Sequence, residues 1–477
     1  MGYKTGVDKK QLTLLPVSLD EYIPEDHICR IIAAFTGQVD IAGLGYRYAE
    51  CKDTGRRPYD PRIMLNLYIY GYLHRVRSSR RLRDEAKRNV EVMWLTDGLT
   101  PDDKTVCNFR KDNAKALRET FRVFVGMCRA LGLYGGEVIA VDGTRIRADN
   151  SLKNHWNKTV VGNELERTDK KINEYMKLLE ETDREEAGET EPGACEIRAA
   201  LEKLREKKVT YEGLRSRLAA EKEISSVDPD ARMVRTGGDG RELDVGYNVQ
   251  TVADGKYHMI VDFEVTDNSG DAGNLHKMSV KAKEALEVEE ITVLADKGYY
   301  SGEDIAACEG DGVTCLVAKR KPGGSVKSKE FSRGNFIYDK NKDIYTCPAG
   351  NPMKLMRVGK KNGGKEYRIY AGYEACRKCP KKSGCTKYAY REMWRLPCQD
   401  IVDEVDERTR KNRELYRKRR EIIEHIFGTV KSAWGYRQYL CRTVPKVTAE
   451  TALAYLAYNM RRAVNIYRES KLIPVFG

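Results

Sequence analysis

The chain has 477 residues, 41% of them hydrophobic and 33% charged, which is typical of a globular protein with more than one structural unit. Its 85 Lys and Arg residues outnumber its 72 Asp and Glu residues, and the net charge of +13 favours a polyanionic partner such as nucleic acid. No run of about 18 apolar residues, no apolar leader and no disulfide framework is evident, which argues against a membrane-spanning or secreted protein. We therefore expect a cytoplasmic protein.

Residues 1–135 are predicted to form a helical, DNA-binding domain. An amphipathic helix begins at Pro61, a strongly basic helix spans 80–88, and a long helix is expected from Asp103 to about Ala130. Short basic helices at this spacing are typical of helix-turn-helix modules, although a solvated helical bundle has the same pattern. The side chains expected to contact DNA from this domain are Arg80, Arg81, Arg83, Lys104 and Arg110.

The middle of the chain has the pattern of an α+β domain with a mixed sheet. Residues 136–154 and 225–321 are predicted to form its first part, and residues 401–477 its helical C-terminal part. The expected order is three strands, a helix, a strand, a helix, a strand and a helix, which resembles a ribonuclease-H-like domain. In such a domain the mixed sheet gathers acidic residues at the ends of adjacent strands.

Two insertions interrupt this domain. Residues 155–224 are rich in Glu, Lys and Leu with helical spacing and break at Gly188–Gly193, which predicts an inserted helical hairpin that projects as an arm. Residues 322–400 form a second, cysteine-rich insertion that resembles a zinc knuckle. It contains little apolar sequence, so a bound metal ion is expected to supply much of its folding energy.

Three acidic residues are the strongest functional signal in the chain. Asp142 ends the apolar run 138–141, Asp296 ends the apolar run 291–295, and Glu424 lies in a late charged helix. Acids at two strand ends and on one helix can converge on two divalent ions, Mg²⁺ or Mn²⁺, which promote in-line attack on a phosphodiester. These three residues are the predicted catalytic and metal-binding residues.

Two basic residues accompany Glu424 on its helix. Arg420 precedes it by four residues and Lys431 follows it by seven, so at 3.6 residues per turn all three share one face. Both cations are expected to hold DNA phosphates, although a surface salt-bridge ladder has the same spacing. Glu421 is the rival acid on this helix, and Asp271 is a further carboxylate that is expected to help order the metal site.

These motifs resemble those of the DDE transposases of bacterial insertion sequences. The matching segments are Asp142-Gly-Thr, Asp296-Lys-Gly-Tyr-Tyr, and Arg420 and Lys431 around Glu424, and the layout is most similar to the "eleven-eighty-two" type with its Tyr-Arg-Glu-Lys signature. One departure concerns Tyr416, which is separated from Arg420 by three residues, whereas Arg419 has the usual spacing. The resemblance also assigns a base-stacking role to a tryptophan in the insertion, here Trp394.

The resemblance implies a transposase that binds the terminal inverted repeats of its element, cuts the DNA at the ends and joins the 3′ ends to target DNA. It also implies two metal ions per active site, a homodimer assembled on double-stranded DNA, and a location at the bacterial nucleoid. Two alternatives remain open from the residues. One is a transposase-derived DNA-binding regulator without catalysis, and the other is a ribonuclease-H-like nuclease that cuts without strand transfer.

Four cysteines in the second insertion have the spacing of a metal site. Cys376 and Cys379 form a Cys-x2-Cys knuckle. Cys385 follows this knuckle closely, and Cys347 lies a long segment before it. Thiolates in this arrangement suit a closed, structural, tetrahedral Zn²⁺ site, although the four residues can also be free cysteines. Cys398 is the expected substitute ligand.

Overall fold

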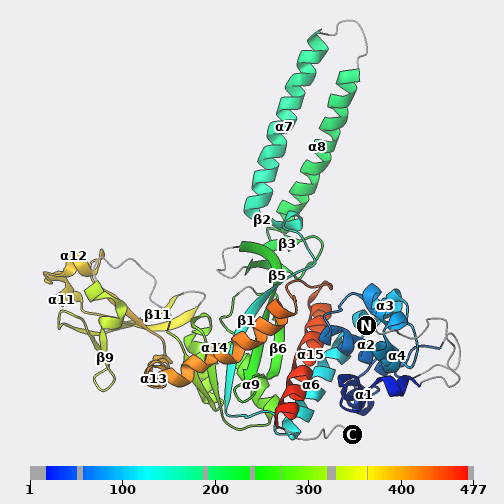
Figure 1. Cartoon of the computed structure of the whole chain (residues 1–477). Helices are drawn as coiled ribbons and strands as arrows, with labels where there is room; N and C mark the ends of the chain where they lie inside the picture. The colour runs from blue at the N-terminus through cyan, green and yellow to red at the C-terminus, as the bar shows by residue number, and fades with distance from the viewer. Residues whose placement is uncertain are drawn as a thin grey trace, which may run out of the picture.

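The computed structural model describes residues 18–50, 57–185, 192–236, 242–268, 270–319, 329–361 and 364–470. The chain forms a mixed α and β structure in which a central sheet lies between N-terminal helices on one side and a small second sheet on the other (Figure 1). A two-helix arm projects from one end of the central sheet. Within the described ranges, no helix combines the length and apolar content that crossing a membrane would require.

The N-terminal unit is a cluster of helices around α2. Eleven of the thirteen residues of α2 are buried, so this helix is enclosed on all sides and the other helices pack around it. Its elements are η1 (Leu19–Tyr22), α1 (Ile28–Gln38), α2 (Pro61–Leu73), α3 (Ser79–Arg88), α4 (Val90–Leu95), α5 (Asp103–Asp112) and α6 (Ala114–Ala130).

The long helix predicted from Asp103 to Ala130 is wrong in one respect, because the structure divides it into α5 and α6. The division lies at Asn113, which is buried. Its side-chain amide donates to the carbonyl of Phe109 at 2.8 Å, and its side-chain oxygen accepts the backbone N–H of Arg47 at 2.6 Å. A buried asparagine that bonds to local backbone competes with continuous helix at that point.

The central sheet has the strand order β4-β5-β1-β7-β8, and β6 also pairs with β5 beyond the end of β4. The pairs β1–β5 and β5–β6 are antiparallel, whereas β1–β7 and β7–β8 are parallel. The strands are β1 (Val138–Arg147), β4 (Arg232–Thr236), β5 (Glu242–Asp254), β6 (Ile260–Thr266), β7 (Ile291–Ala295) and β8 (Val313–Val317). The expected order of these strands and of their intervening helices is present, and β4 is an additional strand.

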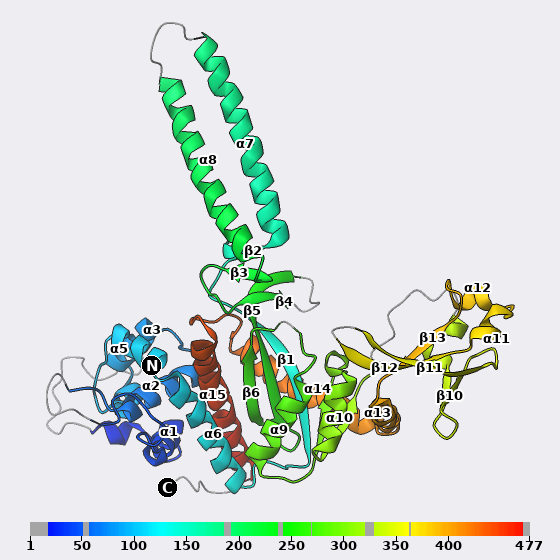
Figure 2. The ribbon, with the colours of Figure 1, turned by 180° about the vertical axis from the view of Figure 1, so that it is seen from behind.

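Helices cover both faces of this sheet. Helix α14 crosses β1 on one face (Figure 1), and α9 lies on the opposite face (Figure 2). Helix α15 packs on α6 and α2 as well as on β6, and it thereby joins the N-terminal helices to the sheet in one continuous apolar core. The helices of this layer are α9 (Leu275–Leu286), α10 (Gly302–Gly310), α13 (Gln399–Lys411), α14 (Arg413–Phe427) and α15 (Val444–Ser470).

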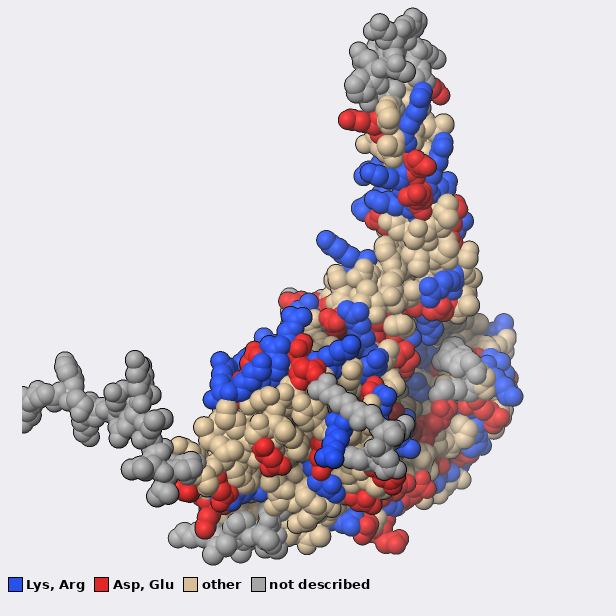
Figure 3. Space-filling view, turned by 90° about the vertical axis from the view of Figure 1, so that its right-hand side faces the viewer, with Lys and Arg blue, Asp and Glu red and all other residues tan. Residues whose placement is uncertain are grey.

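The arm consists of two long helices on a short ribbon, as a helical-hairpin insertion requires. The ribbon pairs β2 (His155–Asn157) with β3 (Glu223–Ser225), and α7 (Lys158–Glu185) and α8 (Pro192–Arg217) extend from it (Figure 2). Its own apolar cluster lies at the base and includes Val161 and Leu218, separate from the main core. Lys and Arg side chains gather along the arm and below it, interspersed with Asp and Glu (Figure 3).

The cysteine-rich insertion forms a second, five-stranded antiparallel sheet with the order β13-β12-β11-β10-β9. The sheet has an apolar core of its own, which contains Phe331, Phe336, Tyr345, Met353, Tyr370 and Met393. The segment therefore has more apolar packing than its composition suggested, and the contribution of a metal ion to its folding energy stays a prediction. Its elements are β9 (Ile337–Asp339), β10 (Ile344–Thr346), β11 (Pro352–Lys361), β12 (Lys365–Ala371), α11 (Tyr373–Arg377), α12 (Lys382–Cys385) and β13 (Glu392–Arg395).

Candidate active site

Asp142 and Asp296 lie side by side where β7 ends. The expectation that Asp142 also lies at a strand end was wrong, because β1 continues to Arg147 and Asp142 pairs with Thr251 of β5. In the parallel pair β1–β7, Val141 is in register with Ala295, and the two aspartates are the next residues along their strands. The Asp296 carboxylate accepts the backbone N–H of Gly298 at 2.5 Å as the cap of a short helical turn, which holds it at the strand end. Register alone therefore brings together two acids that are far apart in sequence.

Electrostatic repulsion and burial both act on the Asp142 carboxylate. Burial raises the pKa of Asp142 to about 6, the guanidinium of Arg419 opposes this rise, and the charges of Asp296 and Asp271 add to it. Arg419 donates to the Asp142 carboxylate at 2.8 Å from α14, and the backbone N–H of Gly143 donates to it at 2.8 Å. A buried carboxylate with acidic neighbours and one cation has the charge balance that a metal ion would complete.

Asp271 approaches the same end of the sheet from the loop before α9. Its carboxylate accepts hydrogen bonds from Arg145 at 2.8 Å and from Asn248 and Gln250 at 3.0 Å each. It also packs against Gly143, where an added Cβ would lie 2.5 Å from its oxygen and would displace the Asp271 side chain. This location agrees with the expectation that Asp271 helps to order the acidic site.

The sequence analysis did not identify the residues that hold Asp271. Asn248 and Gln250 alternate along β5 and are fully buried. The buried phenol of Tyr299 donates to the side-chain carbonyl of Gln250. A signal was present, because two amide side chains two residues apart in a strand point to the same face. It carried no information about their partner, which comes from another part of the chain.

Helix α14 faces the two aspartates with Tyr416 and Arg419. Burial raises the pKa of Tyr416, and its other neighbouring charges are Arg419, Asp296 and Asp142. The arginine at the usual spacing from Tyr416 is thus the one that contacts the acidic site. Arg420, the predicted phosphate ligand, is exposed on this helix.

Glu424 is exposed on α14, and its carboxylate is not in the same tight group as Asp142 and Asp296. Among the residues that the structure describes, these three carboxylates do not form a set whose oxygen atoms all lie within 4.8 Å of one another. The rival acid Glu421 lies near His258, in the connection between β5 and β6. Its negative charge opposes the lowering of the His258 pKa that burial causes.

Lys431 does not continue the regular face of α14. The chain passes into a π-helical turn (Gly428–Ala433), so the count of 3.6 residues per turn no longer places Lys431 over Glu424. Burial lowers the pKa of Lys431, and the neighbouring charges of Arg145 and Arg437 lower it further. Arg145 also bonds to Asp271, so Lys431 lies near the acidic end of the sheet.

Most of the basic side chains predicted to contact DNA from the N-terminal unit are on its surface. Arg80, Arg81 and Lys104 are exposed, and the side chain of Arg80 has 81% of its area accessible. Arg83 is partly buried and donates to Asp84 at 2.8 Å and to Asp103 at 3.0 Å, which links α3 to α5. Arg80 also forms a long ion pair with Asp103 at 3.9 Å, but its exposure leaves it, like Arg81 and Lys104, accessible to a phosphate. Arg83 has a structural role as well.

The prediction for Arg110 was wrong. Its side chain is buried, it donates to the Tyr72 hydroxyl at 3.1 Å, and it lies over the Tyr68 ring at 5.6 Å from the ring centroid. An arginine enclosed by α2 cannot reach a DNA backbone. A signal was present, because Val106 and Phe109 precede Arg110 by four residues and one residue on the buried face of α5.

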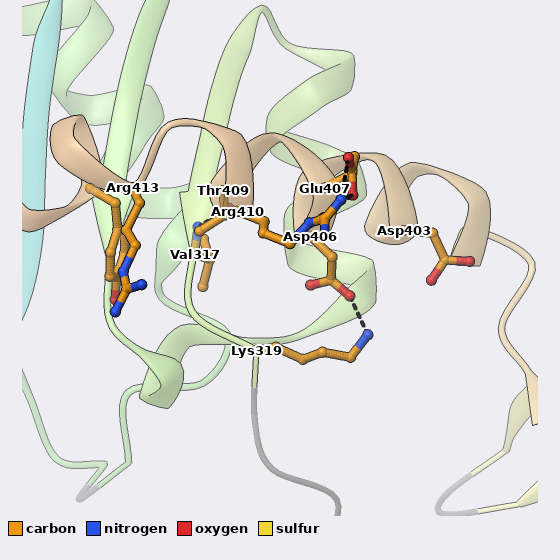
Figure 4. Close-up of a pocket in the computed structure, with 9 residues that line it drawn as sticks. Val317, Lys319, Asp403, Asp406, Glu407, Thr409, Arg410 and Arg413 are labelled. Carbon is orange, nitrogen blue, oxygen red and sulfur yellow. Dashed lines mark hydrogen bonds and ion pairs between the residues drawn. The ribbon is translucent and has the colours of Figure 1, made fainter. Parts of the chain in front are cut away.

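A cavity of about 630 Å³ opens beside Tyr416 and runs along α13 (Figure 4). Charged side chains line it, and several are already paired: Lys319 bonds to Asp406, and Arg410 bonds to Glu407 at 2.8 Å. Arg413 projects into it from the start of α14. The cavity gives the acidic site an adjoining surface of mixed charge.

The four cysteines of the second sheet line one small pocket together with Phe331, Phe336 and Met353. Burial raises the pKa of the Cys385 thiol; among its charged neighbours, Arg391 lowers that pKa, and Cys376, Cys347 and Cys379 raise it. The sulfur atoms converge on this pocket, but no three of them lie within 4.8 Å of one another among the described residues. Cys398 lies elsewhere, against Gly302 at the start of α10, and does not line the pocket.

Trp394 lies on β13 with its ring half-buried. Its indole N–H donates to Glu392 at 3.0 Å, and its ring meets Tyr367 edge-on with centroids 5.7 Å apart. The insertion therefore carries an aromatic pair at Trp394, and the base-stacking role of this residue stays a prediction.

Two family models match the chain. The model described as "Transposase domain (DUF772)" matches residues 17–112, which cover most of the N-terminal helices. The model described as "Transposase DDE domain" matches residues 346–464, which run from the cysteine-rich sheet through α14 into α15. No curated protein and no solved structure matches the chain.

Proposed function

We propose, from the premise that this chain is a DDE transposase of an insertion sequence, that it binds the terminal inverted repeats of its element and cuts the DNA there. It then joins the freed 3′ ends to target DNA by transesterification. Asp142, Asp296 and Glu424 are the proposed catalytic residues. The bacterial nucleoid is the proposed place of action, since both DNA substrates lie there.

The observation that carries this proposal is the register of β1 and β7, which puts Asp142 and Asp296 next to each other under α14. The strand order supports it: an antiparallel β6-β5-β1 unit followed by parallel β7 and β8 resembles the sheet of ribonuclease-H-like enzymes. In that fold, acids on the first and fourth strands hold the metal ions, and we propose that Asp142 on β1 and Asp296 after β7 take these positions.

The carboxylates of Asp142, Asp296 and Glu424 would hold two divalent ions, with Asp271 ordering the site through Arg145. When bound, such ions activate the attacking oxygen and stabilise the leaving oxygen. Arg419 holds the Asp142 carboxylate in place at 2.8 Å. Arg420 and Lys431 are proposed to bind phosphates on either side of the scissile bond and so keep the attack in line.

The N-terminal unit is proposed to recognise the inverted repeats through Arg80, Arg81, Arg83 and Lys104. Arg110 is not proposed to contact DNA, because its side chain is buried. A homodimer on DNA follows from the chemistry, because two element ends must be cut in concert.

The cysteine pocket is proposed to hold a structural Zn²⁺ ion through Cys347, Cys376, Cys379 and Cys385. Trp394 is proposed to stack on a DNA base. Zinc absent from freshly purified protein would remove the proposed zinc site.

The test is strand cleavage of labelled DNA that carries the inverted repeat of the element. We expect cutting at the repeat boundary in Mg²⁺ or Mn²⁺ and none in EDTA. Asp142→Asn, Asp296→Asn and Glu424→Gln should each lower the rate by about a thousandfold or more while DNA binding persists. The joined product with target DNA is measured in the same reactions.

Glu421→Gln is the matched control, because Glu421 is an exposed glutamate on the same helix that faces His258. It should keep the wild-type rate. A folded wild type that binds the repeat but never cuts it would point to a regulator, and cutting without joined product would point to a nuclease. Loss of cutting in Glu421→Gln but not in Glu424→Gln would move the third catalytic position to Glu421.

A further inference from the structure

Three potential metal ligands from two helices meet in the N-terminal unit, in a group that contains none of the residues proposed to cut DNA. His27 caps α1, Cys29 lies in its first turn, and Glu91 lies in the first turn of α4. One ligand atom from each of them lies within 4.8 Å of the other two. In the part of the chain that the structure describes, no other group of His, Cys, Asp and Glu side chains meets this condition.

The geometry of the group is close to that of a tetrahedral zinc site. Bonds of about 2.0–2.3 Å at tetrahedral angles separate neighbouring ligand atoms by about 3.3–3.6 Å. The Nε2 atom of His27 lies 3.7 Å from the nearer carboxylate oxygen of Glu91, a distance that is long for a hydrogen bond. The other oxygen of Glu91 accepts the Tyr70 hydroxyl at 2.7 Å, which fixes the orientation of the carboxylate.

Cys29 is the fully buried member of the group. Its side chain packs in the main apolar core and is a free thiol. Burial, together with the charge of Glu91, raises the pKa of the thiol to about 12. A thiol in this state is a poor nucleophile, so a catalytic or redox-sensing role does not account for it.

We propose that His27, Cys29 and Glu91 bind one Zn²⁺ ion, which joins the start of α1 to the start of α4. One thiolate, one imidazole and one carboxylate are ordinary zinc ligands, and water or the neighbouring His74 would fill the fourth position. Binding releases the Cys29 proton to solvent, because the thiolate is the ligand. Metal binding also breaks the long hydrogen bond of 3.3 Å from the Cys29 backbone N–H to Nδ1 of His27. This bond is lost whichever ring nitrogen of His27 binds the ion.

The consequence of this site would be local stiffening of the DNA-binding unit. Helix α4 follows α3 after a single residue, and α3 carries Arg80 and Arg81. The same end of the unit is already joined by Asp20, which bonds to Arg30 of α1 at 3.0 Å and to the Trp94 indole of α4 at 2.9 Å. A metal ion would add a second link between the same two helices.

The test is a Co²⁺ titration of the full chain, because Co²⁺ replaces Zn²⁺ and its bond to a thiolate absorbs in the near ultraviolet. The parent protein carries Cys376→Ser and Cys379→Ser, which removes the knuckle of the other proposed zinc site. We expect about one equivalent of Co²⁺ to give a thiolate absorption band. Cys29→Ser should abolish this band.

Two further variants separate ligand loss from misfolding. Cys128→Ser removes another fully buried thiol of the same unit and should keep the band. Glu91→Gln keeps the shape of the side chain and should weaken Co²⁺ binding by about tenfold or more, with helix content unchanged by circular dichroism. A folded parent that binds no Co²⁺, or a band that survives Cys29→Ser, overturns the proposal, and neither result bears on DNA cleavage.

Discussion

At the scale of single residues, the acidic site is arranged around one ion pair. The positive charge of Arg419 favours the ionised form of Asp142, while the negative charges of Asp296 and Asp271 oppose the ionisation of Asp142. Arg419 is only 14% exposed, so solvent screens this pair weakly. The neighbouring Arg420 is exposed. The two adjacent arginines have different surroundings because they lie on different sides of α14, and only Arg420 is proposed to bind a DNA phosphate.

The raised pKa of Asp142 predicts how the stability of the metal-free protein depends on pH. The pKa rises from 3.8 to about 6 on folding, mainly through burial. The stabilising contribution of the protonated group is therefore complete below about pH 4 and is lost as the pH rises through about 6. Asp142→Asn stays neutral, so in EDTA its free energy of unfolding should exceed that of the wild type by about 1–3 kcal/mol at pH 7.5 and match it near pH 4.

Urea unfolding at several pH values measures this difference. Asp26→Asn, at an exposed site, is the control and should follow the wild type throughout. A gap between Asp142→Asn and the wild type that does not change with pH would show that ionisation of Asp142 is not its cause. Added Mg²⁺ should close the gap at pH 7.5, because the ion binds the ionised carboxylate.

At the scale of elements, the approach of α3 to α2 depends on one glycine. A Cβ on Gly71 would lie 2.4 Å from a methyl carbon of Leu82 and 2.5 Å from the carbonyl oxygen of Val76. The backbone carbonyl cannot move away as a flexible side chain would. Gly71 therefore sets the position of the helix that presents Arg80 and Arg81.

We predict that Gly71→Ala destabilises the protein by about 1–3 kcal/mol through overpacking and weakens binding to the inverted repeat. Gly126→Ala on α6 is the matched control, since a Cβ added there would have open space within 4 Å. It should raise stability by about 0.5–1 kcal/mol, because alanine is the better helix former. Chemical denaturation and fluorescence anisotropy measure the two effects, and a neutral Gly71→Ala would contradict this view of the contact.

The arm is an element that the core does not need. Its apolar cluster is separate from the main core, and Asn157 and Glu223 face each other as the last pair of its ribbon. Replacement of residues 158–222 by an Asn-Gly turn should therefore close the ribbon as a hairpin. We predict that the melting temperature of the remaining protein changes by less than about 5 °C.

Differential scanning calorimetry tests this prediction on the shortened chain beside the full chain. A variant that lacks the ribbon as well is the informative comparison, because β3 leads directly into the loop of Asp228, whose carboxylate accepts the Tyr247 hydroxyl at 2.7 Å. That variant should lose stability. Failure of the hairpin variant to unfold cooperatively would mean that the arm contributes to the core.

At the scale of the whole molecule, the excess of positive charge is spread over several surfaces. The net charge is +13, and exposed Lys and Arg side chains occur on the N-terminal unit and the arm. We predict that binding of the full chain to the inverted repeat weakens by about 10³-fold or more between roughly 50 and 200 mM salt, as expected for about six or more phosphate contacts.

Fluorescence anisotropy at several salt concentrations measures this slope. The pair of substitutions Arg80→Ala and Arg81→Ala should reduce it by about two contacts. Arg122→Ala is the control, because Arg122 on α6 is already paired with Glu119 at 3.0 Å and should leave the slope unchanged. Equal slopes for both variants would remove α3 from the proposed DNA interface.

Much of the architecture was determined by local sequence. Short apolar runs that end in Asp142 and Asp296 predicted the central strands, and helical spacing predicted the arm, because hydrophobic periodicity is a local property. Composition was a weaker guide: it underestimated the cysteine-rich sheet, whose core is assembled from scattered aromatic and methionine side chains.

Only the tertiary structure decided which of these residues meet. The pairing of Arg419 with Asp142 and the cage around Asp271 depend on contacts between distant segments, which no local pattern encodes. Strand register placed the two aspartates together, while the π-helical turn after α14 displaced Lys431 from the face that regular spacing predicts. The acids were evident in the sequence, and their neighbours were settled by packing.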